Sequence, residues 1–116
     1  RPPAIWRVEF TPQAERHVQA IDAWWQENRE QARDLFLEEL ASALDSLTSA
    51  PLTGHRCSIR DAPDVRRILL RSSRYHLYYK IARASVTVVA VWSALRGRGP
   101  SVSDLRGTRT KRRRRR

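Results

Sequence analysis

The segment from Val86 to Trp92 reads VTVVAVW and is apolar at every position but one. Such a run predicts a β-strand whose two faces are both apolar, and other parts of the chain must then cover both faces. A strand of this kind lies inside a sheet rather than at its rim. The chain therefore has to build a sheet around this segment.

Further extended segments are predicted on both sides of this strand. Residues Ile5 to Phe10 alternate between apolar and polar side chains, which is the period of a half-buried strand. Val65 to Arg71 and Tyr75 to Ala82 are predicted strands joined by the short link Ser72-Ser73-Arg74. His55 to Asp61 is a further candidate strand. We expect these later strands to form an antiparallel meander, with the first strand at an edge.

Two helices are predicted between the first strand and the meander. Thr11-Pro12 supplies a hydroxyl N-cap and a proline at the first helical position, and apolar residues then recur at helical spacing up to Trp25. Asn28 and Gln31 resemble a capping box, so a second helix is expected to begin directly at this point. The fold class is α+β: an N-terminal edge strand, an antiparallel two-helix hairpin on one face of the sheet, and then an antiparallel β-meander.

The length of 116 residues fits a single domain with one hydrophobic core. We place this domain at residues 1–100. Residues 101–116 contain few apolar side chains and end in KRRRRR, so this segment is expected to be a disordered basic tail.

The positive charge of the chain is concentrated in its second half. The net charge is +11, but Glu9 to Asp45 carries nine acidic and three basic residues, whereas Arg56 to Arg116 carries eighteen basic and three acidic ones. This asymmetry suggests an acidic or polyanionic partner for the second half, and solubility alone is the alternative. Seven of the cations lie between Arg109 and Arg116, which weakens the case for strong non-specific binding of nucleic acid.

Cys57 is the single cysteine, which excludes an internal disulfide and suits a reducing compartment. No metal-ligand cluster is visible, and we expect neither a metal nor a cofactor. The chain shows no signal-peptide pattern and no apolar run long enough to cross a bilayer, so we expect a cytoplasmic protein with no membrane partner.

The closing strands RRILLRSSRYHLYYKI and VTVVAVWSALRGRGP, preceded by a helical hairpin, resemble those of the RelE/ParE superfamily of toxins from bacterial type II toxin-antitoxin pairs. The resemblance covers roughly Val8 to Pro100. Its most specific element is the final pair of strands, with one arginine just before the first and another just after the second. The resemblance implies a toxin that a cognate acidic antitoxin neutralises.

The resemblance leaves two activities open. RelE-like members resemble metal-independent endoribonucleases that cut messenger RNA on the ribosome, and Arg67, His76 and Arg96 are the catalytic candidates if this chain is one of them. His76 would act as the base, and Tyr78 or Tyr79 would donate a proton. However, Leu69 stands where this pattern has a second strand lysine, Ser93 stands near the place of a histidine, and no tyrosine follows Pro100.

ParE-like members resemble inhibitors that bind DNA gyrase and trap it on cleaved DNA, and the long helical hairpin favours this activity. The candidate target-binding residues are then Arg66, Arg71, Arg74, Arg96 and Arg98. A solvated strand face is the alternative for any one of these arginines. A third interpretation is an inactive family member that only binds its antitoxin, so the sequence leaves open whether the chain is an enzyme.

Trp24 and Trp25 are the candidate antitoxin-binding residues. Adjacent helical positions point about 100° apart, so the two indoles cannot share one narrow stripe and Trp24 is expected to be partly exposed. The resemblance implies that an antitoxin lays a helix along the helical hairpin and an extended segment against the sheet. Packing under the C-terminal loop, or against a second copy of the chain, is the alternative.

Overall fold

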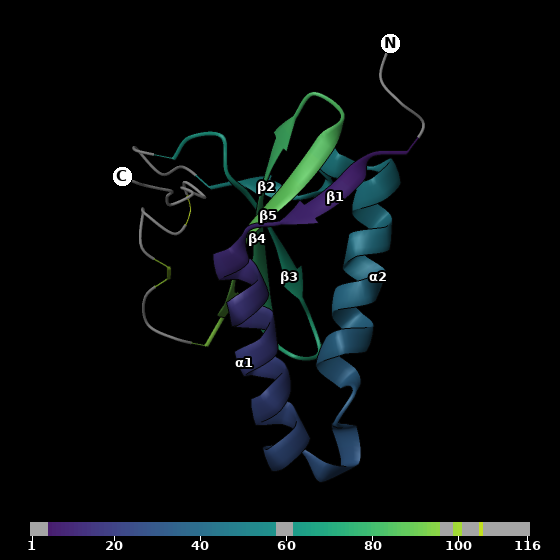
Figure 1. Cartoon of the computed structure of the whole chain (residues 1–116), viewed down its shortest axis with the longest axis vertical. Coiled ribbons are helices and arrows are strands. Elements are labelled where there is room, and N and C mark those ends of the chain that lie inside the picture. The colour runs from purple at the N-terminus through teal and green to yellow at the C-terminus, as the bar shows by residue number, and fades with distance from the viewer. Residues whose placement is uncertain (1–4, 58–61, 96–98, 101–104, 106–116) are drawn as a thin grey trace, which may run out of the picture.

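The computed structural model describes residues 5–57, 62–95, 99–100 and 105 (Figure 1). Their helices and strands are β1 (Arg7–Phe10), α1 (Pro12–Asn28), α2 (Leu35–Ser49), β2 (His55–Arg56), β3 (Arg66–Leu70), β4 (Tyr75–Ala82) and β5 (Ser85–Ser93), with short 3₁₀ turns at Glu30–Ala32 and Pro51–Thr53. The class is α+β, as predicted. No helix among these residues is long and apolar enough to cross a membrane.

The five strands form one sheet in the order β1-β5-β4-β3-β2. Strands β2 to β5 are an antiparallel meander, which confirms the prediction. β1 lies at an edge, also as predicted, but it runs parallel to β5, with Arg7 opposite Ser85 and Phe10 opposite Val88. The apolar strand β5 therefore lies between two neighbours, inside a mixed sheet.

A β-bulge decides which side chains of β5 face the helices. Tyr78 of β4 pairs with Ala90 and Tyr79 pairs with Val88, so Val89 is an extra residue on β5. Val88 and Val91 consequently both belong to the core under the helices, while Val89 and Ala90 belong to a second cluster. One inserted residue thus changes the alternation halfway along the strand.

Both faces of β5 are covered, as its composition requires. The helical hairpin covers one face, where Phe36, Leu40 and Leu47 of α2 are buried against the sheet (Figure 1). The opposite face carries a smaller cluster in which Val65 and Leu105 are buried with residues of β4 and β5. Leu105 falls in the segment that we expected to be a disordered tail, and the other residues of 101–116 lie outside the described part of the chain.

The start of the first helix is as predicted, but the start of the second is not. Thr11 caps α1 by accepting the N–H of Ala14 at 3.1 Å. Asn28, however, is the last residue of α1, and its side-chain amide donates to the carbonyl of Trp24 at 2.8 Å instead of capping a new helix. The chain then passes through a 3₁₀ turn, and α2 begins only at Leu35.

The predicted strand at His55 to Asp61 is much shorter in the structure. Only His55 and Arg56 pair with β3, opposite Arg67 and Arg66. Residues 58–61 lie outside the described part of the chain, so the rest of that prediction is not addressed.

Candidate functional site

The arginines of β3 point to opposite faces of the sheet. Arg66 lies on the helix side, where its guanidinium donates to the carbonyl of Gly54 at 2.8 Å and more weakly to that of Leu52 at 3.4 Å. Arg67 follows it directly and is exposed on the other face. Although the sequence places several candidate arginines on or beside this strand, its two arginines do not form one cationic surface. The alternation of side chains along a strand prevents this, because neighbouring residues face opposite ways.

Arg67 shares the face opposite the helices with two other candidate residues, and we call Arg67, His76 and Tyr78 the open-face group, in which Arg67 is exposed and Tyr78 is buried at 5%. Arg67 pairs with Tyr78 across the strands, and the rings of His76 and Tyr78 lie 6.0 Å apart at 67°. Burial, followed by the nearby charge of Arg67, lowers the pKa of His76 below its ordinary value. The imidazole is therefore neutral near pH 7 and is able to accept a proton.

Tyr79 faces the other way and is fully buried. Its hydroxyl donates to the carbonyl of Pro51 at 2.7 Å and accepts the N–H of Gly54 at 2.8 Å. Burial raises the pKa of this phenol, although the hydrogen bond from Gly54 acts against the shift. The interpretation of Tyr79 as a proton donor to a substrate is therefore wrong, since its hydroxyl supports the fold.

Arg71 and Arg74 lie together on the turn between β3 and β4, residues 71–74, which we call the hairpin tip. Both are exposed. The N–H of Arg74 donates to the carbonyl of Leu70 at 2.8 Å, and its carbonyl accepts the N–H of Ala94 at 2.9 Å. Ala94 precedes Arg96 by two residues. Arg96 and Arg98 themselves lie outside the described part of the chain.

The hairpin tip is also fixed to α2 by a carboxylate that sequence reasoning missed. Glu39 accepts the N–H of Ser72 at 2.7 Å, the N–H of Ser73 at 2.8 Å and the hydroxyl of Ser73 at 2.6 Å. Burial would raise the pKa of Glu39, but the hydrogen bonds from Ser73 and Ser72 outweigh it and hold the pKa below its ordinary value. The side chain is therefore charged over most of the pH range.

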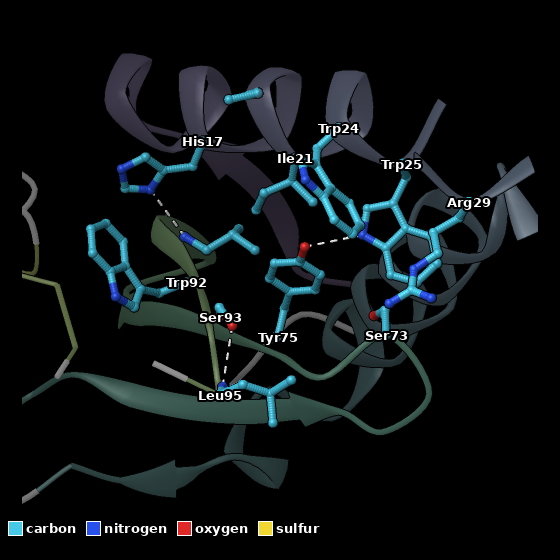
Figure 2. A pocket seen from close by; sticks show the side chains of 12 residues that line it. His17, Ile21, Trp24, Trp25, Arg29, Ser73, Tyr75, Trp92, Ser93 and Leu95 are labelled. Carbon is cyan, nitrogen blue, oxygen red and sulfur yellow. Dashed lines mark hydrogen bonds between the residues drawn. The ribbon is translucent and has the colours of Figure 1, made fainter. Parts of the chain in front are cut away.

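An apolar groove of about 440 Å³ lies between α1 and the end of β5 (Figure 2). Trp24 is 45% exposed, as predicted, whereas Trp25 is buried at 6%. Trp25 donates its indole N–H to the hydroxyl of Tyr75 at 3.0 Å, which joins α1 to the first residue of β4 (Figure 2). The structure therefore places the two candidate antitoxin-binding residues at one groove, but only Trp24 has a large free surface.

Arg29 is a further groove residue that the sequence analysis did not single out. Its guanidinium carbon lies 5.5 Å from the ring centre of Trp24 and 5.7 Å from that of Trp25, within the range of a cation–π contact. The signal available in the sequence was the position of Arg29 four to five residues after the two tryptophans, directly after the end of α1. Arg29 gives the wall of the groove a positive charge.

His17 closes the other end of the groove. Its Nδ1 atom accepts the N–H of Val91 at 3.2 Å, and its ring lies edge-on to Trp92 at 5.5 Å (Figure 2). Leu95 also lines the groove and is 74% exposed. Over the described ranges, no group of histidine, cysteine, aspartate or glutamate side chains is placed to hold a metal ion.

Comparisons with known proteins agree with this architecture. A family model described as the ParE toxin of the type II toxin-antitoxin system parDE matches residues 8–98, from within β1 to beyond β5. A structure of the chromosomal ParDE system from P. aeruginosa is similar in fold, with a TM-score of 0.62, 12% sequence identity, and coverage of 78% of this chain and 98% of that one. No curated protein sequence matches the chain significantly.

A second similar structure is that of a free arginine double mutant of the E. coli toxin RelE. It has 26% sequence identity to this chain and a TM-score of 0.48, and the match covers 78% of this chain and 85% of that one.

Proposed function

This chain belongs to the ParE family of toxins from type II toxin-antitoxin systems, and we propose that it inhibits bacterial growth by binding DNA gyrase and trapping it on cleaved DNA. The toxin class follows from the family. The gyrase target is our proposal, and it rests on the activity implied by the resemblance to ParE-like toxins.

The observation that best supports this target is the hairpin tip. Two exposed arginines, Arg71 and Arg74, stand on a turn that is hydrogen-bonded to β3, to α2 and to the chain leaving β5. Cations on a fixed backbone lose little backbone entropy on binding, so they suit an acidic surface of a protein–DNA complex. We assign Arg71 and Arg74 as target contacts, together with Arg96 and Arg98, which follow β5 in the sequence.

Arg66 is a weaker candidate for target binding. Its guanidinium is already engaged by the carbonyls of Gly54 and Leu52, and it lies on the helix side of the sheet. We propose that it fixes the segment after α2, and that the target contacts come from the hairpin tip and from Arg96 and Arg98.

Expression of the chain without an antitoxin tests the target directly. Filamentous cells with a DNA damage response, and stabilised cleavage complexes in an assay with purified gyrase, are expected. Abrupt arrest of protein synthesis with cut transcripts would instead indicate a ribosome-dependent nuclease. Unimpeded growth, with no effect on gyrase, would indicate an inactive family member.

The substitution Arg74→Gly separates the role of the cation from the stability of the turn. Arg74 adopts a φ of 66°, a left-handed conformation that glycine accepts without strain, so this change removes the charge while preserving the turn. Arg83→Gly is the matched control, because Arg83 is also an exposed arginine with a positive φ, of 52°, at the turn between β4 and β5. We expect Arg74→Gly to weaken gyrase inhibition about tenfold and Arg83→Gly to leave it unchanged. Equal effects of the two variants would show that only net charge matters.

The open-face group supports an endoribonuclease as the second candidate function. His76 is neutral near pH 7 and lies on the same face as Arg67 and Tyr78, so a base and a cation are close together. If the chain cleaves RNA, His76→Ala should reduce cleavage by roughly 10²- to 10⁴-fold with the fold intact. Unchanged cleavage in this variant would remove His76 from the active site.

We further propose that the antitoxin binds at the groove, with Trp24 as its main contact and Trp25 as the buried support. The groove is apolar, Arg29 adds a positive charge to its wall, and an exposed indole is a frequent centre of binding energy. An acidic antitoxin segment with apolar side chains suits this combination. Trp24→Ala is expected to weaken binding of the cognate antitoxin at least about tenfold without altering gyrase inhibition.

A further inference from the structure

The hairpin tip has a backbone conformation that needs external support. Arg74 has a φ of 66°, which is unfavourable for a residue with a side chain and persists where surrounding contacts hold it. Two of those contacts are the hydrogen bonds of Arg74 to Leu70 and Ala94. The third contact is the carboxylate of Glu39 on the two residues that precede Arg74.

Glu39 constrains the turn with both of its oxygen atoms. Oε2 takes the N–H of Ser72, while Oε1 takes both the N–H and the hydroxyl of Ser73. Ser73 is only 7% exposed, so its polar atoms depend on these bonds more than an exposed serine would. Two successive backbone amides held by one carboxylate cannot turn independently, which fixes the direction of the backbone between Arg71 and Arg74.

We propose that Glu39 is a positioning residue for toxin activity, which holds the hairpin tip so that Arg71 and Arg74 are presented together to the target. This inference rests on the proposed function for the identity of the target. Glu39 does not touch the target itself, and it acts only through the turn.

The role of Glu39 is separable from the packing of α2 on the sheet. Phe36, almost one turn earlier on α2, contacts the ring of Tyr75 edge-on at a centroid distance of 5.1 Å and is fully buried. Leu40 and Leu47 are buried on the same helix. Loss of the Glu39 carboxylate should therefore release the turn while α2 stays in place.

The test compares Glu39→Gln with Glu38→Gln in the full chain. The two substitutions make the same change in charge and size at adjacent positions, but Glu38 is exposed and makes no side-chain hydrogen bond within the described residues. Amide hydrogen exchange, measured by NMR, should be about tenfold faster at Ser72 and Ser73 in Glu39→Gln, and unchanged in Glu38→Gln. Ser73→Ala provides a milder variant, because it removes only the hydroxyl bond.

The functional measurement is how strongly each toxin variant stabilises the cleavage complexes that purified gyrase forms with DNA. Glu39→Gln is expected to weaken it about tenfold, and Glu38→Gln to leave it unchanged. In an Arg71→Ala/Arg74→Gly background, Glu39→Gln should produce no additional loss, because the residues that it positions are already gone. A residue with a merely structural role would cause the same loss in both backgrounds.

Three results would overturn the inference. The first is unchanged amide exchange at Ser72 and Ser73 in Glu39→Gln, and the second is full gyrase inhibition by that variant despite faster exchange. The third is that Glu39→Gln causes the same loss of gyrase inhibition in the wild-type chain and in the Arg71→Ala/Arg74→Gly variant. If the wild-type chain has no effect on gyrase or on growth, the proposed function fails, and the exchange measurement alone then decides whether Glu39 holds the turn.

Discussion

Gly54 donates its backbone N–H to the hydroxyl of Tyr79 at 2.8 Å, which ties the segment after α2 to the centre of the sheet. A side chain on Gly54 would collide with the Tyr79 hydroxyl and approach the Arg67 carbonyl at 3.0 Å. The hydrogen bond between Gly54 and Tyr79 therefore requires glycine at this position. The same hydroxyl donates to Pro51. The contact therefore joins the helical hairpin to the meander.

Tyr79→Phe should destabilise the fold by about 1–3 kcal/mol, because the N–H of Gly54 and the carbonyl of Pro51 would both lose a buried partner. Tyr78→Phe is the control, since the hydroxyl of Tyr78 makes no hydrogen bond within the described residues. Urea unfolding of the two variants measures the difference. Equal unfolding free energies would contradict the structural role of the Tyr79 hydroxyl.

Trp25→Ala and Trp24→Ala should separate stability from partner binding. Trp25 is buried and bonded to Tyr75, so its truncation should cost about 3–5 kcal/mol. Trp24 is 45% exposed, and its truncation should cost about 1 kcal/mol or less. Thermal unfolding gives the first comparison and antitoxin titration the second. A large loss of stability in Trp24→Ala would mean that this indole belongs to the core.

Arg67→Ala should raise the pKa of His76 toward its ordinary value of 6.5 without reaching it. Burial is the larger cause of the lowered pKa and remains in the variant, whereas the repulsion between two cations is removed. An NMR titration of the imidazole measures this. Arg66→Ala, on the opposite face, is the control and should leave the titration unchanged.

The lowered pKa of His76 also has a consequence for stability. The unfolded chain binds this proton more readily than the folded one, so His76 should reduce the unfolding free energy as the pH falls below 6.5. The unfolding free energy should fall less steeply with decreasing pH in Arg67→Ala, because the pKa of His76 is then closer to its unfolded value.

Glu39 should stabilise the fold only while it is ionised. Its pKa in the folded state is lower than the unfolded value of 4.5, so the stabilisation is present above that value and disappears as the pH falls through the folded pKa. We expect the unfolding free energy of wild type to exceed that of Glu39→Gln by about 1 kcal/mol near pH 7, and the difference to vanish once the pH lies below the folded-state pKa of Glu39. Urea midpoints at several pH values test this, and a difference that persists in acid would exclude the ionised carboxylate as its source.

The strands of the meander and the interior position of β5 could be predicted because they depend on local alternation and apolar composition. The parallel pairing of β1 could not be predicted, because the alternation of apolar and polar side chains from Ile5 to Phe10 is the same for a parallel and an antiparallel strand. The start of α2 was missed because the side chain of Asn28 donates to the carbonyl of Trp24 within α1 and does not cap a following helix.

The candidate site was predictable only in part. The exposure of Trp24 followed from helical geometry, and the same strand alternation that located β3 also separates Arg66 from Arg67, a consequence that our sequence analysis did not apply. Glu39 left no local signal, because Ser72 and Ser73 lie 33 and 34 residues further along the chain. A contact of that kind becomes visible only when the elements are packed together.

Ser73 belongs to both features of the site. Glu39 holds it at the hairpin tip, and it also lines the wall of the groove that contains Trp24. A ligand in the groove that displaces Ser73 therefore also displaces Arg74. Thermodynamic linkage then requires reciprocity, so that target engagement weakens the groove ligand by the same factor by which the groove ligand weakens target engagement. An antitoxin seated there would compete with the target energetically, even where the two never meet.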